Sequence, residues 1–137
     1  MIDSEHETFR DWPVGTSPCE VGKRVAGNFE ARPFEKPGRG ITYPEVCAWY
    51  GALTFAQLSG DNGLRDRLVR RLDSFLTPVG SKNISPEAHV DCRVFGSVPL
   101  EIYLQAKELK ALDLGKHFAD RQWETPTPDG ITTEARY

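Results

Sequence analysis

The densest group of side chains that could carry chemistry outside a helical pattern is the run His89-Val90-Asp91-Cys92-Arg93-Val94-Phe95-Gly96. A carboxylate such as Asp91 can act as a general acid or base if burial raises its pKa, or can accept hydrogen bonds from sugar hydroxyls if it stays ionised. It can instead pair with Arg93 or cap a turn, and composition alone favours that structural role. His89, Asp91 and Cys47 do not stand at spacings typical of a metal site, so we expect no metal and no cofactor.

Aromatic side chains beside polar ones form a second kind of candidate. Tyr43 precedes a helical pattern that carries Trp49, and rings at helix ends either stack on sugars or fill a core. For Trp49 we expect the core. Trp123 follows Asp120-Arg121-Gln122 and could be either an aromatic platform or a core residue, so both alternatives stay open.

The elements that must position these residues are helices, divided by capping residues and prolines. Ser17 and Glu20 form a capping box with Pro18 between them, which predicts a helix from there to a point before Pro33. Its apolar stripe has a spacing of four, at Val21, Val25 and Phe29. We expect residues 1–16 to form a flexible tail.

A second capping box, Thr42 with Glu45, predicts a helix that Gly60 ends. Its apolar face consists of Val46, Trp49, Tyr50, Leu53 and Ala56. Asn62 is expected to cap a third helix that continues to Pro78, and so short a link makes these two helices antiparallel. Its apolar stripe is Leu64, Leu68, Leu72 and Phe75 or Leu76.

Residues 80–96 show neither helical nor strand periodicity and predict a long loop. Ser97 is expected to cap the next helix, with Leu100, Tyr103 and Leu104 on one face. A further helix ends before Pro126, with an apolar face at Leu109, Leu112, Ala119 and Trp123. Such successive hairpins predict an all-α fold, either an α-solenoid or an α/α-barrel.

Composition narrows the function classes. The net charge is −3 and the basic residues are scattered among acidic ones, so we expect neither nucleic acid nor a membrane as a partner. Three cysteines without a Cys-x-x-Cys pair predict no disulfide framework. The acidic N-terminus lacks the pattern of a secretory signal, so we expect a cytoplasmic protein, or a periplasmic one if the N-terminus is incomplete.

Three sequence blocks carry a family resemblance when taken in order. They are Thr42-Tyr43-Pro44-Glu45-Val46-Cys47-Ala48-Trp49-Tyr50-Gly51-Ala52-Leu53, then Asp91-Cys92-Arg93-Val94-Phe95-Gly96 with Pro99-Leu100-Glu101, and Phe118-Ala119-Asp120-Arg121-Gln122-Trp123. In order and spacing they resemble glycoside hydrolase family 105, a relative of family 88. These families comprise unsaturated rhamnogalacturonyl and glucuronyl hydrolases folded as (α/α)6 barrels.

The resemblance implies that residues 17–137 form the N-terminal portion of a six-hairpin α/α-barrel. Its substrate would be an oligosaccharide that ends in a 4,5-unsaturated uronic acid, and its reaction the hydration of the enol-ether double bond. Asp91 would be one of the catalytic carboxylates in the active site, and Tyr43 would be its neighbour in the pocket. We add His89, Arg93 and Trp123 as further substrate-binding candidates.

The family has a second essential aspartate, its main proton donor, in an aromatic-Asp-Asp block just after the positions that match 135–137, where this sequence ends. We therefore expect an N-terminal fragment without full activity. Inner helices that lack neighbours would expose apolar faces, so we also expect self-association, poor solubility or a partly molten state. The alternative function is a noncatalytic helical interaction module, an open solenoid in which Asp91 is structural.

Overall fold

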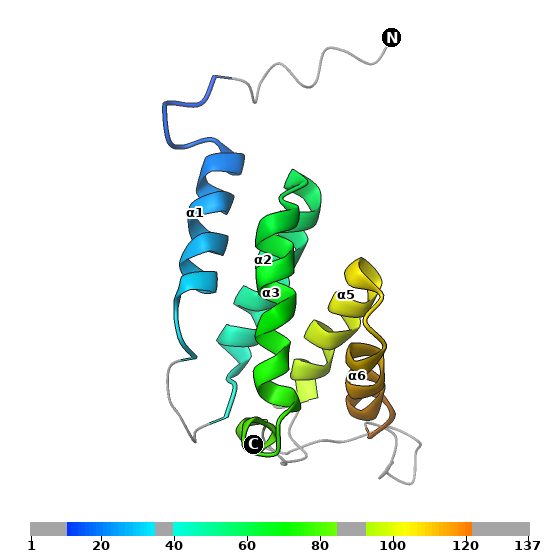
Figure 1. The fold of residues 1–137 in the computed structure, drawn as a ribbon. Coiled ribbons are helices and arrows are strands. Elements are labelled where there is room, and N and C mark those ends of the chain that lie inside the picture. Colours follow the sequence, from blue (N-terminus) through cyan, green and yellow to red (C-terminus); the bar gives the residue numbers. More distant parts are fainter. Residues whose placement is uncertain (1–10, 35–39, 85–92, 122–137) are drawn as a thin grey trace, which may run out of the picture.

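The computed structural model describes residues 11–34, 40–84 and 93–121, which contain helices and no strand, so the all-α prediction is confirmed. Figure 1 shows the helices side by side. The α-helices are α1 (Pro18–Ala31), α2 (Tyr43–Ser59), α3 (Asn62–Arg70), α5 (Ser97–Ala106) and α6 (Leu109–Arg121). Short 3-10 helices are η2 (Arg71–Leu76), η3 (Gly80–Asn83) and η4 (Val94–Gly96).

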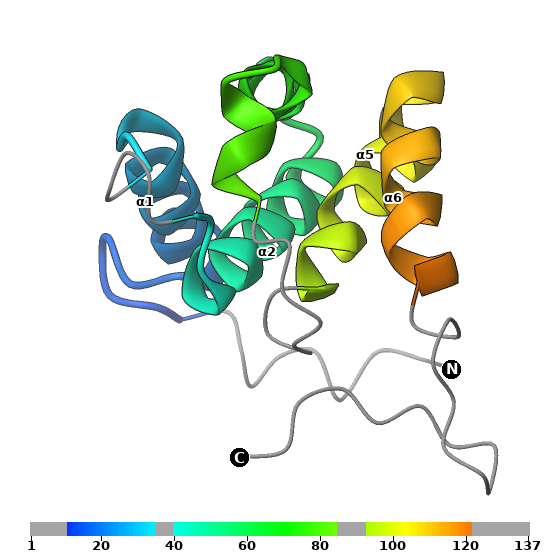
Figure 2. The ribbon, with the colours of Figure 1, turned by 90° about the horizontal axis from the view of Figure 1, so that it is seen from below.

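The α-helices alternate in direction. Helices α2 and α5 run the same way and pack against each other, whereas α1, α3 and α6 run the opposite way (Figure 1). Viewed from below, α2 lies between α1 and α5, α6 lies beyond α5, and α3 covers α2 (Figure 2). The N-terminal ends of α2 and α5 therefore share one end of the molecule, called the lower end here, with the C-terminal ends of α1 and α6. Closure into a barrel stays a prediction.

Both predicted capping boxes are present. The Glu20 amide donates to Ser17 Oγ at 3.2 Å, and the Ser17 amide donates to Glu20 Oε2 at 3.2 Å. The Thr42 amide and hydroxyl both donate to Glu45 Oε2, each at 2.8 Å. Local sequence thus fixes the starts of α1 and α2.

The ends of these two helices also match the sequence. Helix α1 ends at Ala31, before Pro33. Gly60 closes α2 with φ +69°, a left-handed conformation that favours glycine. Upstream of α1, Thr16 donates from its amide to the Pro13 carbonyl at 3.0 Å, so the predicted tail ends in a hydrogen-bonded turn. Residues 1–10 lie outside the described part.

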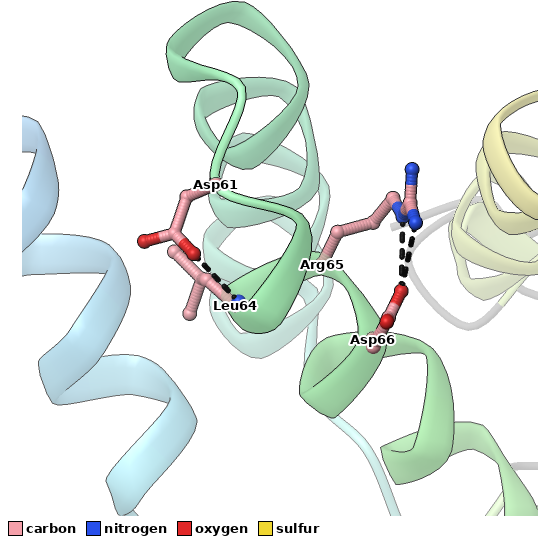
Figure 3. Close-up of polar contacts among 4 residues, drawn as sticks. All are labelled: Asp61, Leu64, Arg65 and Asp66. Carbon is pink, nitrogen blue, oxygen red and sulfur yellow. Dashed lines mark hydrogen bonds and ion pairs between the residues drawn. The ribbon is translucent and has the colours of Figure 1, made fainter.

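The start of α3 corrects a prediction. Asp61 caps this helix, not Asn62, because Asp61 Oδ1 accepts a hydrogen bond from the Leu64 amide at 2.9 Å (Figure 3). Both residue types cap well, but a carboxylate also interacts favourably with the positive end of the helix dipole. The ion pair between Arg65 and Asp66, 2.9 Å long, lies at the surface beside this cap (Figure 3).

After α3 the chain continues as 3-10 helices. The segment predicted as the rest of the third helix is η2, and its Leu72 and Phe75 are buried as expected, whereas Leu76 is exposed. The loop predicted for 80–96 contains η3 and η4, and residues 85–92 of it lie outside the described part. No helix among the described residues is long and apolar enough to cross a membrane.

The predicted faces of α5 and α6 are only partly right, because Tyr103 packs against the core and Leu100 against Gly115, whereas Leu104 and Leu109 are exposed. Ser97 does not cap α5, since η4 precedes it and the Ser97 hydroxyl donates to the Val94 carbonyl at 2.8 Å. The buried face of α5 is Val98, Pro99 and Ile102. The buried face of α6 is Ala111, Gly115 and Phe118. A Cβ on Gly115 would lie 2.6 Å from Leu100 Cγ, so close backbone approach at a glycine decides how these two helices pack.

The apolar stripe predicted on α1 is only partly buried. Val25 is 63% exposed and Val21 is also exposed, while Ala26 is buried. Helix α1 meets α2 through small residues, because a Cβ on Gly22 would lie 2.4 Å from the Phe55 ring. The two valines are therefore turned away from α2.

A continuous series of aromatic rings runs through the core. Trp49 is fully buried, as predicted, and its Nε1 donates to the Leu68 carbonyl at 3.2 Å. Neighbouring ring centroids lie 5.0 to 5.8 Å apart along Phe34, Trp49, Phe75, Phe95 and Phe118. The rings join segments from the end of α1 to α6, so one core holds all the described helices together.

Candidate functional site

The predicted site residues that can be placed belong to the lower end. Tyr43 is the first residue of α2 and is 51% exposed. Arg93 directly precedes η4 and α5. His89, Asp91 and Trp123 lie outside the described residues. The starts of α2 and α5, which belong to the first two sequence blocks, therefore lie at the same end of the molecule (Figure 1). The end of α6, which belongs to the third block, lies there too.

Arg93 is buried in the packing between α5 and α6. The residue is only 6% exposed. Its Nη1 donates a hydrogen bond to the backbone carbonyl of Arg121, the last residue of α6. A guanidinium there donates to a helix C-terminal carbonyl and interacts favourably with the negative end of the helix dipole. This contact gives Arg93 a structural role, and its contact with a substrate stays a prediction.

Arg71 makes a similar contact that the sequence did not reveal. Its Nη1 donates to the carbonyls of Glu30 at 2.7 Å and Arg32 at 3.0 Å, at the end of α1. Its guanidinium carbon lies 4.8 Å from the ring centroid of Phe29 and 4.3 Å from that of Phe34. Both are cation–π contacts.

Partial burial affects the pKa of Arg71. Desolvation lowers the pKa of its guanidinium, and the carboxylates of Glu30 and Glu45 act in the opposite direction. An arginine nevertheless stays protonated in proteins. The buried Nε of Arg71 has no hydrogen-bond partner, so the cation is held mainly by the two carbonyls and the two rings.

A hollow of about 230 Å³ opens beside Arg71, between the end of α1 and the start of α2. Its lining combines aromatic rings, two guanidinium groups and a carboxylate: Phe29, Arg32, Pro33, Phe34, Thr42, Pro44, Glu45, Ala48 and Arg71. Rings with nearby polar groups are typical of sugar-binding sites, but Glu45 already accepts hydrogen bonds from Thr42 and Arg71 already donates to carbonyls. The hollow thus offers mainly ring and apolar surface.

The other charged contacts lie at the surface. Lys110 Nζ donates to Asp73 Oδ1 at 2.6 Å, which raises the lysine pKa, and Arg67 lies 3.3 Å from Glu30. Exposed pairs of this kind add little stability. Within 11–34, 40–84 and 93–121, no three His, Cys, Asp or Glu residues are grouped to hold a metal ion.

No family model matches this chain, and neither the curated proteins nor the solved structures contain a significant match to it. The resemblance to family 105 therefore depends on the three sequence blocks alone.

Proposed function

We propose that this chain is the N-terminal part of a glycoside hydrolase that acts on oligosaccharides ending in a 4,5-unsaturated uronic acid. One observation supports this most strongly. Helix α2, which begins at Tyr43, and helix α5, which follows Arg93 and η4, run parallel, lie side by side and are rich in apolar residues with few charged ones. Helices of that kind normally lie inside a larger helical structure.

The contrast with the other helices strengthens this support. Helix α2 contains one charged residue, Glu45, and α5 contains one, Glu101. Helices α1, α3 and α6 are amphipathic and direct charged residues outward. An inner pair of parallel helices with antiparallel outer partners is the arrangement expected of part of an α/α-barrel.

The proposed chemistry is a hydration. An active-site aspartic acid donates a proton to C4 of the uronic acid, the oxygen of a water molecule adds to C5, and the proton that this water loses passes to an active-site carboxylate, which removes the double bond. Asp91 is one of the carboxylates that share these two proton transfers. The hemiketal formed at C5 opens to a ketone and leaves a hemiacetal at C1. This hemiacetal breaks its bond to the glycosidic oxygen, which gives an aldehyde and releases the neighbouring sugar with a free hydroxyl. Tyr43, His89, Arg93 and Trp123 surround the sugar in this proposal, which needs no cofactor and assigns the protein to the cytoplasm.

The test compares binding and turnover of an unsaturated galacturonyl disaccharide. Binding to this chain is measured by calorimetry against the saturated disaccharide. Turnover is measured in a longer form that contains the family's second aspartate, by the loss of ultraviolet absorbance of the double bond. We expect the unsaturated sugar to bind more tightly and Asp91→Asn to lower turnover by about 100-fold or more. Asp113→Asn, at an exposed position of α6, is the matched control. Equal effects of the two substitutions would refute the role of Asp91.

A noncatalytic helical interaction module is the second candidate. Arg71 and Arg93, two cations near the candidate site, each donate to backbone carbonyls, and apolar residues such as Leu58 and Leu104 are exposed. Exposed apolar surface favours a protein partner or self-association. A stable protein complex together with no binding of any unsaturated uronide would favour this module over the hydrolase.

A further inference from the structure

The hollow between the end of α1 and the start of α2 is separate from the residues that the proposed hydrolase uses. Neither Tyr43 nor Arg93 is among its described lining residues. Its volume of about 230 Å³ is below the roughly 300–1,000 Å³ of pockets that hold drug-sized ligands. The ligand that fits this volume is therefore a single ring with a short substituent.

The charged side chains among the described lining residues leave one net positive charge. They are the guanidinium groups of Arg32 and Arg71 and the carboxylate of Glu45. Glu45 Oε2 accepts hydrogen bonds from the amide and the hydroxyl of Thr42, each at 2.8 Å, so part of its charge is already compensated. A ligand with one negative charge matches this balance.

Arg71 keeps hydrogen-bond donors that the backbone does not use. Its Nη1 donates to the carbonyls of Glu30 and Arg32, whereas Nη2 donates to no described residue and, unlike Nε, is not buried. The carboxylate of Glu30 leaves these donors unoccupied and lies 3.3 Å from Arg67 Nε. The Arg32 side chain is exposed and donates to no described residue. Both guanidinium groups at the hollow thus have donors for a carboxylate.

The apolar part of the lining suits an aromatic ring. Phe29 and Phe34 meet edge to face, with centroids 6.3 Å apart and planes at 73°, and both rings are only half-buried. Arg71 lies over both rings. The rest of the apolar wall consists of Pro33, Pro44 and Ala48. A ring that enters the hollow packs against the two phenylalanines with its substituent beside the guanidinium groups.

We propose that this hollow binds an aromatic carboxylate with one ring, whose carboxylate accepts hydrogen bonds from Arg32 and Arg71 while the ring packs against Phe29 and Phe34. A phosphate with two negative charges matches the single net positive charge less well. The ligand site does not depend on the hydrolase. Sugar turnover without binding of an aromatic carboxylate would overturn this site alone, and the reverse result would overturn the hydrolase alone.

An NMR titration of the ¹⁵N-labelled chain tests the proposal with three probes. Benzoate has both groups, benzyl alcohol has the ring without the charge, and acetate has the charge without the ring. Benzoate is expected to bind at least about 10-fold more tightly than either, because it alone makes both sets of contacts. Its saturable shifts should centre on the amides of Phe34, Glu45 and Ala48. Tighter binding of galacturonate, a sugar carboxylate, than of benzoate would overturn the proposal.

Two matched pairs of variants locate the site. Arg32→Gln removes an exposed guanidinium of the hollow and is expected to weaken benzoate binding by about 10-fold, whereas the exposed Arg70→Gln should not change it. Ala48→Leu fills the hollow and should abolish saturable binding, whereas Cys47→Leu adds bulk at an exposed position outside the hollow and should not. Circular dichroism checks that all four variants fold. Equal effects within either pair, or equal binding of the three probes, would overturn the proposal.

Discussion

Arg93 donates a hydrogen bond to the carbonyl oxygen of Arg121, which ties the segment before η4 to the last residue of α6. Arg71 has the same relationship with the end of α1, which has no basic residue in its own last turn. Two helix C-termini at the lower end are thus closed by arginines from other parts of the chain. These contacts hold together the end of the molecule where the proposed site lies.

Replacing Arg93 tests the first contact. Arg93→Ala removes a charged donor from a partly buried helix C-terminal carbonyl and is expected to lower the free energy of unfolding by about 2 kcal/mol. Arg93→Lys keeps the charge without the planar fork and should recover part of that loss. Chemical denaturation measures both, with the exposed Arg70→Ala as the control. If Arg93→Ala were as mild as Arg70→Ala, the contact would not matter for stability.

Arg71 is expected to be sensitive to a conservative replacement. Its guanidinium bridges two carbonyls and lies over two aromatic rings, and an ammonium group cannot reproduce both sets of contacts. Arg71→Ala should cost about 2 to 3 kcal/mol, and Arg71→Lys should recover less than half of it. Thermal unfolding of the three proteins provides the comparison. An Arg71→Lys variant as stable as the wild type would argue against a role for the rings.

Gly80 is predicted to tolerate no side chain. A Cβ there would lie 1.6 Å from the Ser74 carbonyl oxygen, and backbone must move to relieve that clash. Gly80→Ala is therefore expected to destabilise the fold by about 3 kcal/mol or more. Gly27→Ala, in the open middle of α1, should stabilise it by about 1 kcal/mol. Denaturation midpoints that shift alike for both variants would show that η3 does not pack as described.

The carboxylate of Glu20 makes the stability of the fold depend on pH through the N-terminus of α1. Hydrogen bonds from the Ser17 hydroxyl and then from the Ser17 amide lower its pKa from the ordinary 4.5. The carboxylate therefore adds stability above that value, and the contribution disappears as the pH falls through the folded-state pKa. Glu20→Gln should reduce the difference in stability between neutral and acidic pH, and Ser17→Ala should do the same. Unfolding curves with an unchanged pH dependence would contradict this.

Sequence predicted best what depends on neighbouring residues. The capping boxes at Ser17 and Thr42, the stop at Gly60 and the burial of Trp49 all follow from patterns within a few residues. These elements are confirmed because local hydrogen bonds and helical spacing decide them.

The features that the sequence did not predict depend on contacts between residues that are far apart in the chain. The buried faces of α5 and α6 depend on the close approach at Gly115, a residue that a hydrophobic pattern does not mark. The sequence analysis did not mark Arg71, and it considered Arg93 as a partner of Asp91 or of a substrate, yet each donates to a carbonyl 28 or more residues away. Of the proposed site, sequence supplied the residue types, and only Tyr43 and Arg93 can be placed in the fold.

The most direct test of the proposed hydrolase is an NMR titration of the ¹⁵N-labelled chain with an unsaturated galacturonyl disaccharide. The proposal predicts saturable shifts of the amide signals of Tyr43, Val94 and Phe95, at the starts of α2 and η4, and weaker shifts with the saturated disaccharide. An unchanged spectrum, or shifts confined to residues at the opposite end such as Leu58 and Lys107, would contradict it.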